Sequence, residues 1–198
     1  MEVLARHDQS ISDYIRTVAC DLFCRDGYNG TGMRGLAAAV GIQPGSLYNH
    51  IDSKQTLLYE LVSDYESHLV LLYTHKSLAR CRTASACITL LWESIEQYVI
   101  DNSSLSRVAR SEKGNLTEAQ ACAIARFAER RVLALRTMLC KFARDVGLSE
   151  EGAYELADEL HRLLECNTSL LLASPRADTS FVRRQLRAMA MMLLIKRD

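Results

Sequence analysis

Proline is scarce in this chain of 198 residues, which holds only Pro44 and Pro175. Proline interrupts helices, so long stretches without it that are rich in Leu, Ala, Arg and Glu favour helix throughout. No uncharged apolar run of about 18 residues occurs, and the first ten residues lack the basic start and apolar core of a signal peptide. We therefore expect an all-α protein of the cytoplasm, without a membrane partner.

The chain also lacks an excess of charge of either sign. It holds 24 Lys and Arg residues against 24 Asp and Glu residues, and its first 54 residues hold five basic against six acidic residues. Bulk charge therefore gives no support for nucleic-acid binding. Any such interpretation must rest on a motif and on a local surface.

Paired cysteines are missing as well. The seven cysteines are odd in number and scattered, and no CxxC pair is present, so neither a zinc knuckle nor a thioredoxin-type motif is predicted. Cysteines in helical apolar patterns behave as small hydrophobic residues, and free thiols are typical of a reducing, cytosolic compartment. We expect no metal and no cofactor.

Apolar residues recur at helical spacing along the whole chain, and no segment reads as a strand. Gly27 and Gly41 are expected to end helices, Ser149 is expected to cap one, and Thr117 with Gln120 forms a capping-box pattern. The pattern predicts nine helices, at about residues 10–26, 33–40, 44–51, 54–76, 84–101, 105–111, 117–146, 150–173 and 178–195.

The segment 36–54 has the order of a helix-turn-helix: helix, glycine turn, short helix, capped turn and long helix. In that motif the second helix lies in the major groove of DNA. Leu47 and Ile51, spaced i and i+4, would anchor this helix to the core. The polar and small residues around these anchors would then face DNA, and Lys54 could contact a phosphate; they are Pro44, Gly45, Ser46, Tyr48, Asn49 and His50. Taken alone, the sequence PGSLYNHI fits equally well a half-buried surface helix of an ordinary helical domain.

Positions 11 to 62 resemble the DNA-binding domain of the tetracycline-repressor (TetR) family. The pattern LAxxxGIxxGSLYxHIxSKxxLL of residues 36–58 carries the resemblance, together with matches at Ile15, Ala19, Leu22, Phe23, Gly27 and Tyr28. The resemblance implies three N-terminal helices for DNA and six further helices for ligand binding and dimerisation. By matching motif positions it implies DNA contacts at Arg34, Gln43, Pro44, Gly45, Ser46, Tyr48, Asn49, His50 and Lys54.

Three positions depart from the family pattern. Gly32 stands where the family places Thr or Ser at the cap of its second helix, Ile51 replaces the usual Phe, and Gln43 replaces Ser or Thr. We expect the fold to tolerate these changes. The operator sequence cannot be carried over from a relative.

The resemblance divides the chain into a DNA-binding domain at 1–54 and a ligand-binding and dimerisation domain at 55–198. An inducer pocket is expected among the fifth to eighth helices, lined mostly by apolar groups with a few polar ones. Polar or reactive residues on apolar stripes are the candidates, although surface ion pairs or satisfied core contacts would explain each of them. They are Trp92, Glu96, Tyr98, Cys122, Arg126, Arg130 and Asn167.

An arginine cluster at positions 126, 130, 131 and 136 has two interpretations. It could hold an anionic ligand such as a carboxylate or an acyl-CoA phosphate. It could equally pair with the acidic residues Glu112, Glu118, Glu129 and Asp158.

The last two helices are the usual dimer element of the family. Their apolar faces would suit a four-helix bundle between two chains, with internal core as the alternative. The candidate interface residues are Leu156, Leu160, Leu163, Leu170, Val182, Leu186, Met189 and Leu193.

The sequence therefore predicts a homodimeric repressor that a small-molecule inducer releases from palindromic operator DNA. The alternative is a regulator that senses oxidation or metal through cysteines, for which Cys81, between Arg80 and Arg82, has the one evident electropositive setting. An enzyme is not expected. Cys20 and Cys24 have a possible metal-ligand spacing, but no phosphate loop, HExxH, GxSxG or dinucleotide fingerprint occurs.

Overall fold

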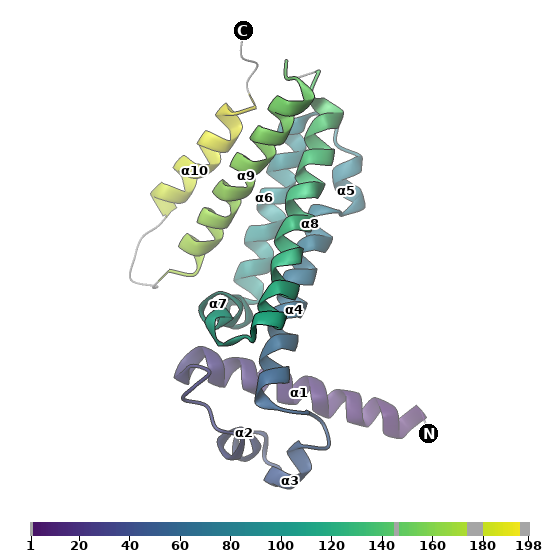
Figure 1. Ribbon diagram of the computed structural model, residues 1–198, viewed down its shortest axis with the longest axis vertical. Coiled ribbons are helices and arrows are strands. Elements are labelled where there is room, and N and C mark those ends of the chain that lie inside the picture. Colours follow the sequence, from purple (N-terminus) through teal and green to yellow (C-terminus); the bar gives the residue numbers. More distant parts are fainter. Residues whose placement is uncertain (1, 145–146, 174–179, 195–198) are drawn as a thin grey trace. The chain divides into compact units, whose positions relative to one another are not determined.

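The protein is all-helical in the computed structural model, which describes residues 2–144, 147–173 and 180–194, with no side chains described for residues 2–10 (Figure 1). Over these residues there are helices and no strand. The elements are α1 (Glu2–Asp26), α2 (Met33–Val40), α3 (Pro44–Leu47), α4 (Lys54–Tyr73), α5 (Lys76–Ala79), α6 (Ala84–Asp101), α7 (Ser103–Ser111), the 3-10 helix η1 (Lys113–Asn115), α8 (Glu118–Phe142), α9 (Glu150–Leu171) and α10 (Ser180–Met192).

The all-α prediction is confirmed, and each of the nine expected helices has a counterpart. The first helix begins at Glu2 instead of about residue 10, and the third ends at Leu47 instead of about residue 51. The fourth was expected to reach Lys76 but ends at Tyr73. The short helix α5 then begins, because the ring Nδ1 of His75 accepts a hydrogen bond from the backbone N–H of Ser77 and caps it. The expected helix ends at Val146 and Ile195 and the expected start near Asp178 lie outside the described residues, whereas the eighth helix, expected to end near residue 173, ends at Leu171.

The predicted helix caps are present. Gly27 and Gly41 have φ of 76° and 82°, the left-handed conformation that lets a glycine end a helix. The Thr117 hydroxyl accepts from the N–H of Gln120 at 3.3 Å, while the Gln120 side chain accepts from the N–H of Thr117 at 3.0 Å. Ser149 accepts from a backbone N–H at 3.1 Å. Local chemistry therefore sets these helix ends.

Two compact units make up the chain. Unit 1 comprises Met1–Glu66 and Ser104–Ile124, and unit 2 comprises Ser67–Ser103 and Ala125–Asp198. Helices α4 and α8 each contribute residues to both units. The functional division after residue 54 stays a prediction.

In unit 1, α1 packs against α2 and α2 against α3. Apolar residues from these helices are almost completely buried, and burying one such side chain contributes about 1.5–3 kcal/mol. They are Ile15, Ala19, Phe23, Leu36, Ala37 and Leu47. This small core fixes α3 against the helices that carry it.

Unit 2 is a helical bundle in which α9 packs against α6, α10 against α9, and α5 against α6 (Figure 1). Trp92 of α6 is completely buried, with Leu135 and Leu139 of α8 and Leu160 of α9 also in the core. Among the described residues, no helix has the length and apolar character needed to cross a membrane.

Candidate functional site

The turn between α2 and α3 is built by backbone chemistry. The left-handed Gly41 lets its own N–H and that of Ile42 donate to the carbonyl of Ala37, each at 3.0 Å. Helix α3 then starts at Pro44, whose missing N–H costs nothing at a first helical position. The chain is thus reversed within a few residues, and α3 leaves α2 in a fixed direction.

Helix α3 is held by the two residues that the spacing predicted. Leu47 is fully buried and Ile51 is 8% exposed, and the N–H groups of His50 and Ile51 both donate to the carbonyl of Leu47. The helical turn therefore continues past the end of α3. It holds residues 48–50 in a defined orientation.

Seven of the nine predicted DNA-contact residues are exposed, and His50 and Lys54 are partly exposed. Tyr48 shows 56% of its surface, and a Cβ added to Gly45 would meet nothing within 4 Å. The exposed residues are Arg34, Gln43, Pro44, Gly45, Ser46, Tyr48 and Asn49. All but Arg34 lie within residues 43–49, and we call these exposed residues, together with His50, the α2–α3 surface.

Lys54 has a contact that sequence reasoning missed. Its ammonium donates to the carbonyl oxygens of Tyr28 at 2.9 Å and Thr31 at 3.0 Å, and lies 4.2 Å from the centre of the Tyr28 ring. The Thr31 hydroxyl in turn donates to the carbonyl of Gly27. Lys54 therefore ties α4 to the loop between α1 and α2, and its phosphate contact stays a prediction.

Gln55 connects the same region to the later helices of unit 1. Its side-chain amide donates to the carbonyl of Asn115 at 3.0 Å and to the side chain of Gln120 at 2.8 Å. Its carbonyl oxygen accepts from the Tyr28 hydroxyl at 2.9 Å, and burial raises the pKa of this tyrosine, which keeps it a neutral donor. Nothing in the local sequence signals this contact, because its partners are far away in the chain.

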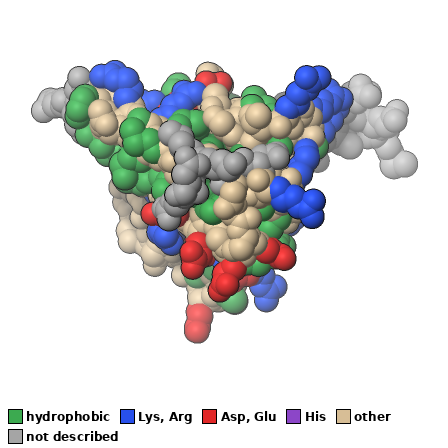
Figure 2. Space-filling model, turned by 90° about the horizontal axis from the view of Figure 1, so that it is seen from above, with side chains coloured by type: hydrophobic (Ala, Val, Ile, Leu, Met, Phe, Trp, Pro, Cys, Tyr) green, Lys and Arg blue, Asp and Glu red, His purple; other side chains and the backbone are tan. Residues whose placement is uncertain are grey.

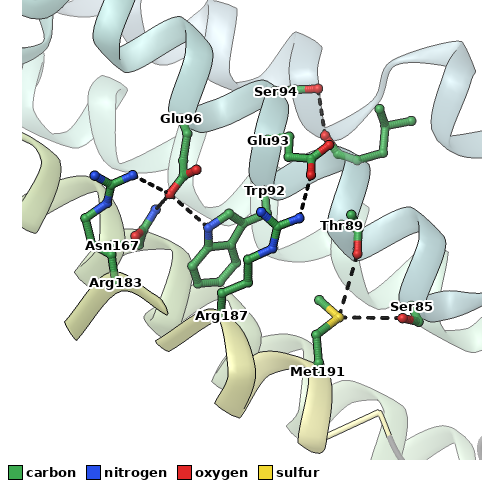
Figure 3. A network of polar contacts seen from close by, with 11 residues as sticks. Ser85, Thr89, Trp92, Glu93, Ser94, Glu96, Asn167, Arg183, Arg187 and Met191 are labelled. Carbon is green, nitrogen blue, oxygen red and sulfur yellow. Dashed lines mark hydrogen bonds and ion pairs between the residues drawn. The ribbon is translucent and has the colours of Figure 1, made fainter. Parts of the chain in front are cut away.

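In unit 2 the structure brings together three of the predicted ligand-binding residues. Figure 3 shows the Glu96 carboxylate accepting from the indole of Trp92 at 3.1 Å, the amide of Asn167 at 3.0 Å and the guanidinium of Arg183 at 3.0 Å. Burial, the largest single influence, would raise the pKa of Glu96. The hydrogen bonds from Arg183, Asn167 and Trp92 and the charge of Arg183 together outweigh it, so the pKa lies below its usual value.

The other predicted ligand-binding residues lie elsewhere. The Tyr98 ring stacks on His68 with centroids 4.1 Å apart, and Cys122, Arg126 and Arg130 are exposed on α8. Tyr98 lines one hollow together with His68, whereas Arg130 alone of the seven lines the mostly apolar cavity beside α5, which has the same volume. The structure therefore does not gather the predicted set around one cavity.

That cavity has a volume of about 500 Å³ and lies between the end of α4, α5 and α8. Its wall is mostly apolar, with cationic side chains at Arg130 and Lys141. Sequence reasoning missed most of the lining because apolar residues on a stripe read as core. The lining residues are Val70, Tyr73, Thr74, His75, Leu78, Ala79, Arg130, Leu133, Ala134, Thr137, Met138, Lys141 and Phe142.

The arginine cluster is divided by ion pairs. Arg136 binds both carboxylate oxygens of Asp158 at 2.8–2.9 Å, as the pairing interpretation expects, and this hydrogen bond lowers the pKa of Asp158. Arg131 is 3% exposed and pairs with Glu165 at 3.2 Å. Two of the four arginines are therefore committed to α9.

The predicted dimer residues fall into three groups, of which one, Leu163, Leu170, Leu186 and Leu193, is partly exposed. Leu156 and Leu160 are buried within the chain's own core, whereas Val182 and Met189 are 46% and 52% exposed on α10. Phe181 and Met192 of the same helix are also exposed. Figure 2 shows exposed hydrophobic side chains gathered beside Lys and Arg side chains. Among the predicted dimer residues, the most exposed apolar side chains are therefore on α10.

All seven cysteines are free thiols, and no three His, Cys, Asp or Glu residues group as metal ligands in the described part of the chain. The pKa of Cys20 is raised to about 12, mainly by burial and to a smaller extent by the charges of Asp21 and Cys24. A buried protonated thiol of this kind is a packing residue.

Comparison with known proteins adds two kinds of match. Residues 15–61 match the family model described as bacterial regulatory proteins, tetR family. The transcriptional repressor KstR2 of Rhodococcus jostii is 33% identical over 82 residues, which cover 40% of this chain and 40% of KstR2. The negative regulator of the biofilm operon icaADBC, IcaR of Staphylococcus aureus, is 27% identical over 183 residues, covering 78% of this chain and 97% of IcaR.

Solved structures match over nearly the whole length. A tetR-family regulatory protein from Rhodococcus RHA1 aligns with a TM-score of 0.75 and 18% identity, over 95% of this chain and 98% of that one. AibR, solved with isovaleryl coenzyme A and operator DNA, aligns with a TM-score of 0.71 and 18% identity, over 94% of this chain and 100% of AibR. At these identities the likeness shows the fold.

Proposed function

We propose that the chain is a transcriptional repressor of the tetR family of bacterial regulatory proteins, which a small molecule releases from a palindromic operator. The observation that carries the proposal is the α2–α3 surface. Two buried apolar residues, Leu47 and Ile51, hold a run of exposed polar and small residues in one orientation. The similarity to the repressor KstR2 and the negative regulator IcaR supports repression over activation.

The residues of this surface suit the major groove of DNA. Gly45 lets the backbone approach closely, and the side chains of Tyr48, Asn49 and His50 can bond base edges or phosphate oxygens. An asparagine can bind adenine through two hydrogen bonds. Arg34 supplies an exposed positive charge. With so few cations, we expect weak non-specific binding and specificity that rests on these contacts.

The inducer is proposed to bind the cavity of unit 2. Its volume of about 500 Å³ lies in the range of small-molecule sites, and its apolar wall with Arg130 and Lys141 suits an apolar molecule that carries an anionic group. AibR, which has the same fold, was solved with an acyl-coenzyme A thioester of this character. The residues Trp92, Glu96 and Asn167 would then support the bundle around it.

Ligand control is proposed to act as a population shift in a homodimer formed through α9 and α10. The α2–α3 surfaces of the two protomers must lie about one DNA turn or a multiple of it apart to engage both half-sites. The ligand would bind more tightly to a conformer in which the two DNA-binding surfaces have a different separation. It can shift the population toward that conformer only by this difference in affinity. Helices α4 and α8 belong to both units and are the proposed connection. We propose a cytoplasmic regulator without catalytic activity, divided functionally at 1–54 and 55–198.

Fluorescence anisotropy with duplexes that tile the DNA upstream of the protein's own gene tests the DNA proposal. Wild type should bind one palindromic duplex tightly, and Tyr48→Ala should lose this binding. Tyr14→Ala is the matched control, because Tyr14 is 53% exposed on α1, outside the α2–α3 surface. Equal weak binding of all duplexes by all three proteins, repeated in a random-duplex library, would rule the proposal out.

Isothermal titration with fatty acids and acyl-coenzyme A thioesters tests the ligand proposal. We expect binding by wild type and weaker binding by Arg130→Ala and Lys141→Ala. Arg126→Ala is the control, because Arg126 is exposed on the same helix and does not line the cavity. No binding of any anionic compound, with induction intact in Arg130→Ala, would contradict the anionic class.

A further inference from the structure

Two thiols converge at the turn between α5 and α6. Cys81 follows the last residues of α5, and Cys87 lies in the first turns of α6. The Cys81 thiol donates to the carbonyl of Ser77 at 3.7 Å, and the Cys87 thiol donates to the carbonyl of Leu78 at 3.2 Å. Because Ser77 and Leu78 are consecutive residues, the two sulfur atoms are drawn to one small region.

The two thiols are also close enough for Cys81 to raise the pKa of Cys87. Their exposures differ, since Cys81 is partly exposed while Cys87 is completely buried. One sulfur is thus accessible to a small reagent from solvent, and the other is held beside it away from solvent. This is the arrangement of an attacking thiol with a resolving thiol.

Exposure favours chemistry at Cys81 over Cys87. Cys81 is partly exposed between Arg80 and Arg82 of the chain, whereas Cys87 is completely buried. Burial, followed by the hydrogen bond and charge of Cys81, raises the pKa of Cys87 to about 12, and the charge of Lys141 opposes this rise. The Lys141 ammonium donates to the carbonyl of Ala79 at 3.1 Å, which fixes it at this turn. The Cys87 thiol therefore stays protonated at neutral pH.

We propose that Cys81 and Cys87 form a reversible disulfide when a peroxide oxidises the protein, so that the α5–α6 turn is a redox site. The Cys81 thiolate attacks one peroxide oxygen, the O–O bond breaks, and after proton transfer a sulfenic acid and one water are formed. The Cys87 sulfur then attacks the Cys81 sulfur, the S–O bond breaks, and the hydroxyl leaves as a second water with the Cys87 proton. Two thiols are oxidised and one peroxide is reduced to two waters.

The site adjoins the proposed ligand cavity. His75, Leu78 and Ala79 line that cavity, and the two thiols bond the carbonyls of residues 77 and 78. Forming the disulfide removes both S–H donors from this wall. Oxidation would thereby alter the cavity, a consequence that rests on the proposed function, whereas formation of the disulfide does not.

Peptide mapping of the full-length protein tests the proposal. Purified reduced protein is treated with hydrogen peroxide, quenched, denatured, alkylated with iodoacetamide and cleaved after lysine. The peptide of residues 77–113 contains Cys81 and Cys87 and no other cysteine. After peroxide we expect it to carry no alkyl group and to have two hydrogen atoms fewer than the free dithiol peptide, and after dithiothreitol and renewed alkylation to carry both alkyl groups again.

Variants assign the roles. Cys87→Ser should leave a sulfenic acid on Cys81 that dimedone captures, and Cys81→Ser should leave Cys87 unlabelled. Cys166→Ser is the control, because Cys166 is exposed on α9 and should not affect the bridge. The proposal is overturned if the wild-type peptide stays doubly alkylated, if Cys81 pairs with another cysteine, or if Cys81→Ser gives the same dimedone label. Circular dichroism of each variant confirms that it is folded.

Discussion

Removing the Glu96 carboxylate should loosen the packing of α6 with α9 and α10. In the folded protein this group accepts hydrogen bonds from Trp92, Asn167 and Arg183, which come from three helices (Figure 3). Glu96→Ala leaves these donors without their acceptor. Trp92 is completely buried and Asn167 is 1% exposed, so water cannot replace the lost carboxylate at either one.

The magnitude follows from these two buried donors. An unsatisfied buried donor costs about 1–3 kcal/mol, and Arg183, whose side chain is 26% exposed, can recover hydrogen bonds from water. We therefore expect Glu96→Ala to lower the free energy of unfolding by about 3 kcal/mol. For a chain of this length that corresponds to a fall in Tm of roughly 6–12 °C.

Thermal unfolding followed by circular dichroism at one fixed protein concentration measures this loss. Glu93→Ala is the matched control, one turn earlier on α6, because Glu93 is 55% exposed and forms a single ion pair with Arg187. Such surface pairs contribute about 0–1 kcal/mol. Equal falls in Tm for Glu96→Ala and Glu93→Ala would refute the reasoning, because burial of the donors would then have no effect.

Three further predictions use the same unfolding measurement. Lys54→Met should lower the free energy of unfolding by about 1–2 kcal/mol through the loss of two loop hydrogen bonds, whereas a purely phosphate-binding lysine would leave it unchanged. Gly41→Ala should lower the free energy of unfolding by about 1–2 kcal/mol, because Gly41 has a left-handed conformation. Gly45→Ala should leave the free energy of unfolding unchanged but weaken operator binding. A destabilised Gly45→Ala beside an unchanged Gly41→Ala would contradict the structure. Because the pKa of Glu96 is lowered in the folded state, its stabilisation is present above the unfolded-state pKa and lost as pH falls through the folded-state pKa. The difference in Tm between wild type and Glu96→Ala should therefore narrow below about pH 4, and a difference that widens in acid would contradict this sign.

Helix boundaries were predictable where they depend on neighbours in the chain. A left-handed glycine such as Gly41, or a capping box such as Thr117 with Gln120, acts within a few residues, so the sequence pattern contains the whole interaction. Helix α5 was missed because its cap is the ring of His75, a residue type that ordinary capping rules do not include. The rest of the fold follows from apolar spacing.

The candidate sites were predictable to unequal degrees for the same reason. The α2–α3 surface lies within one short segment, so its anchors and exposed residues could be read together. The partners of Glu96 in α9 and α10 stand 71 and 87 residues away, and Lys54 meets a loop 23 residues earlier. The lining of the cavity is apolar, and apolar stripes on α4 and α8 give no signal that separates a cavity wall from a filled core.

Selection from a random duplex library tests the central claim most directly. Wild-type protein should enrich a sequence with two-fold symmetry whose half-sites are about one helical turn or a multiple of it apart, and Tyr48→Ala, Tyr14→Ala and wild type are then compared on that duplex. The account predicts that Tyr48→Ala binds it at least about tenfold more weakly, as the loss of one good base contact implies, while Tyr14→Ala binds as wild type does. An enriched sequence without symmetry, or one that wild type and Tyr48→Ala bind equally, would contradict the claim that the α2–α3 surface reads operator DNA.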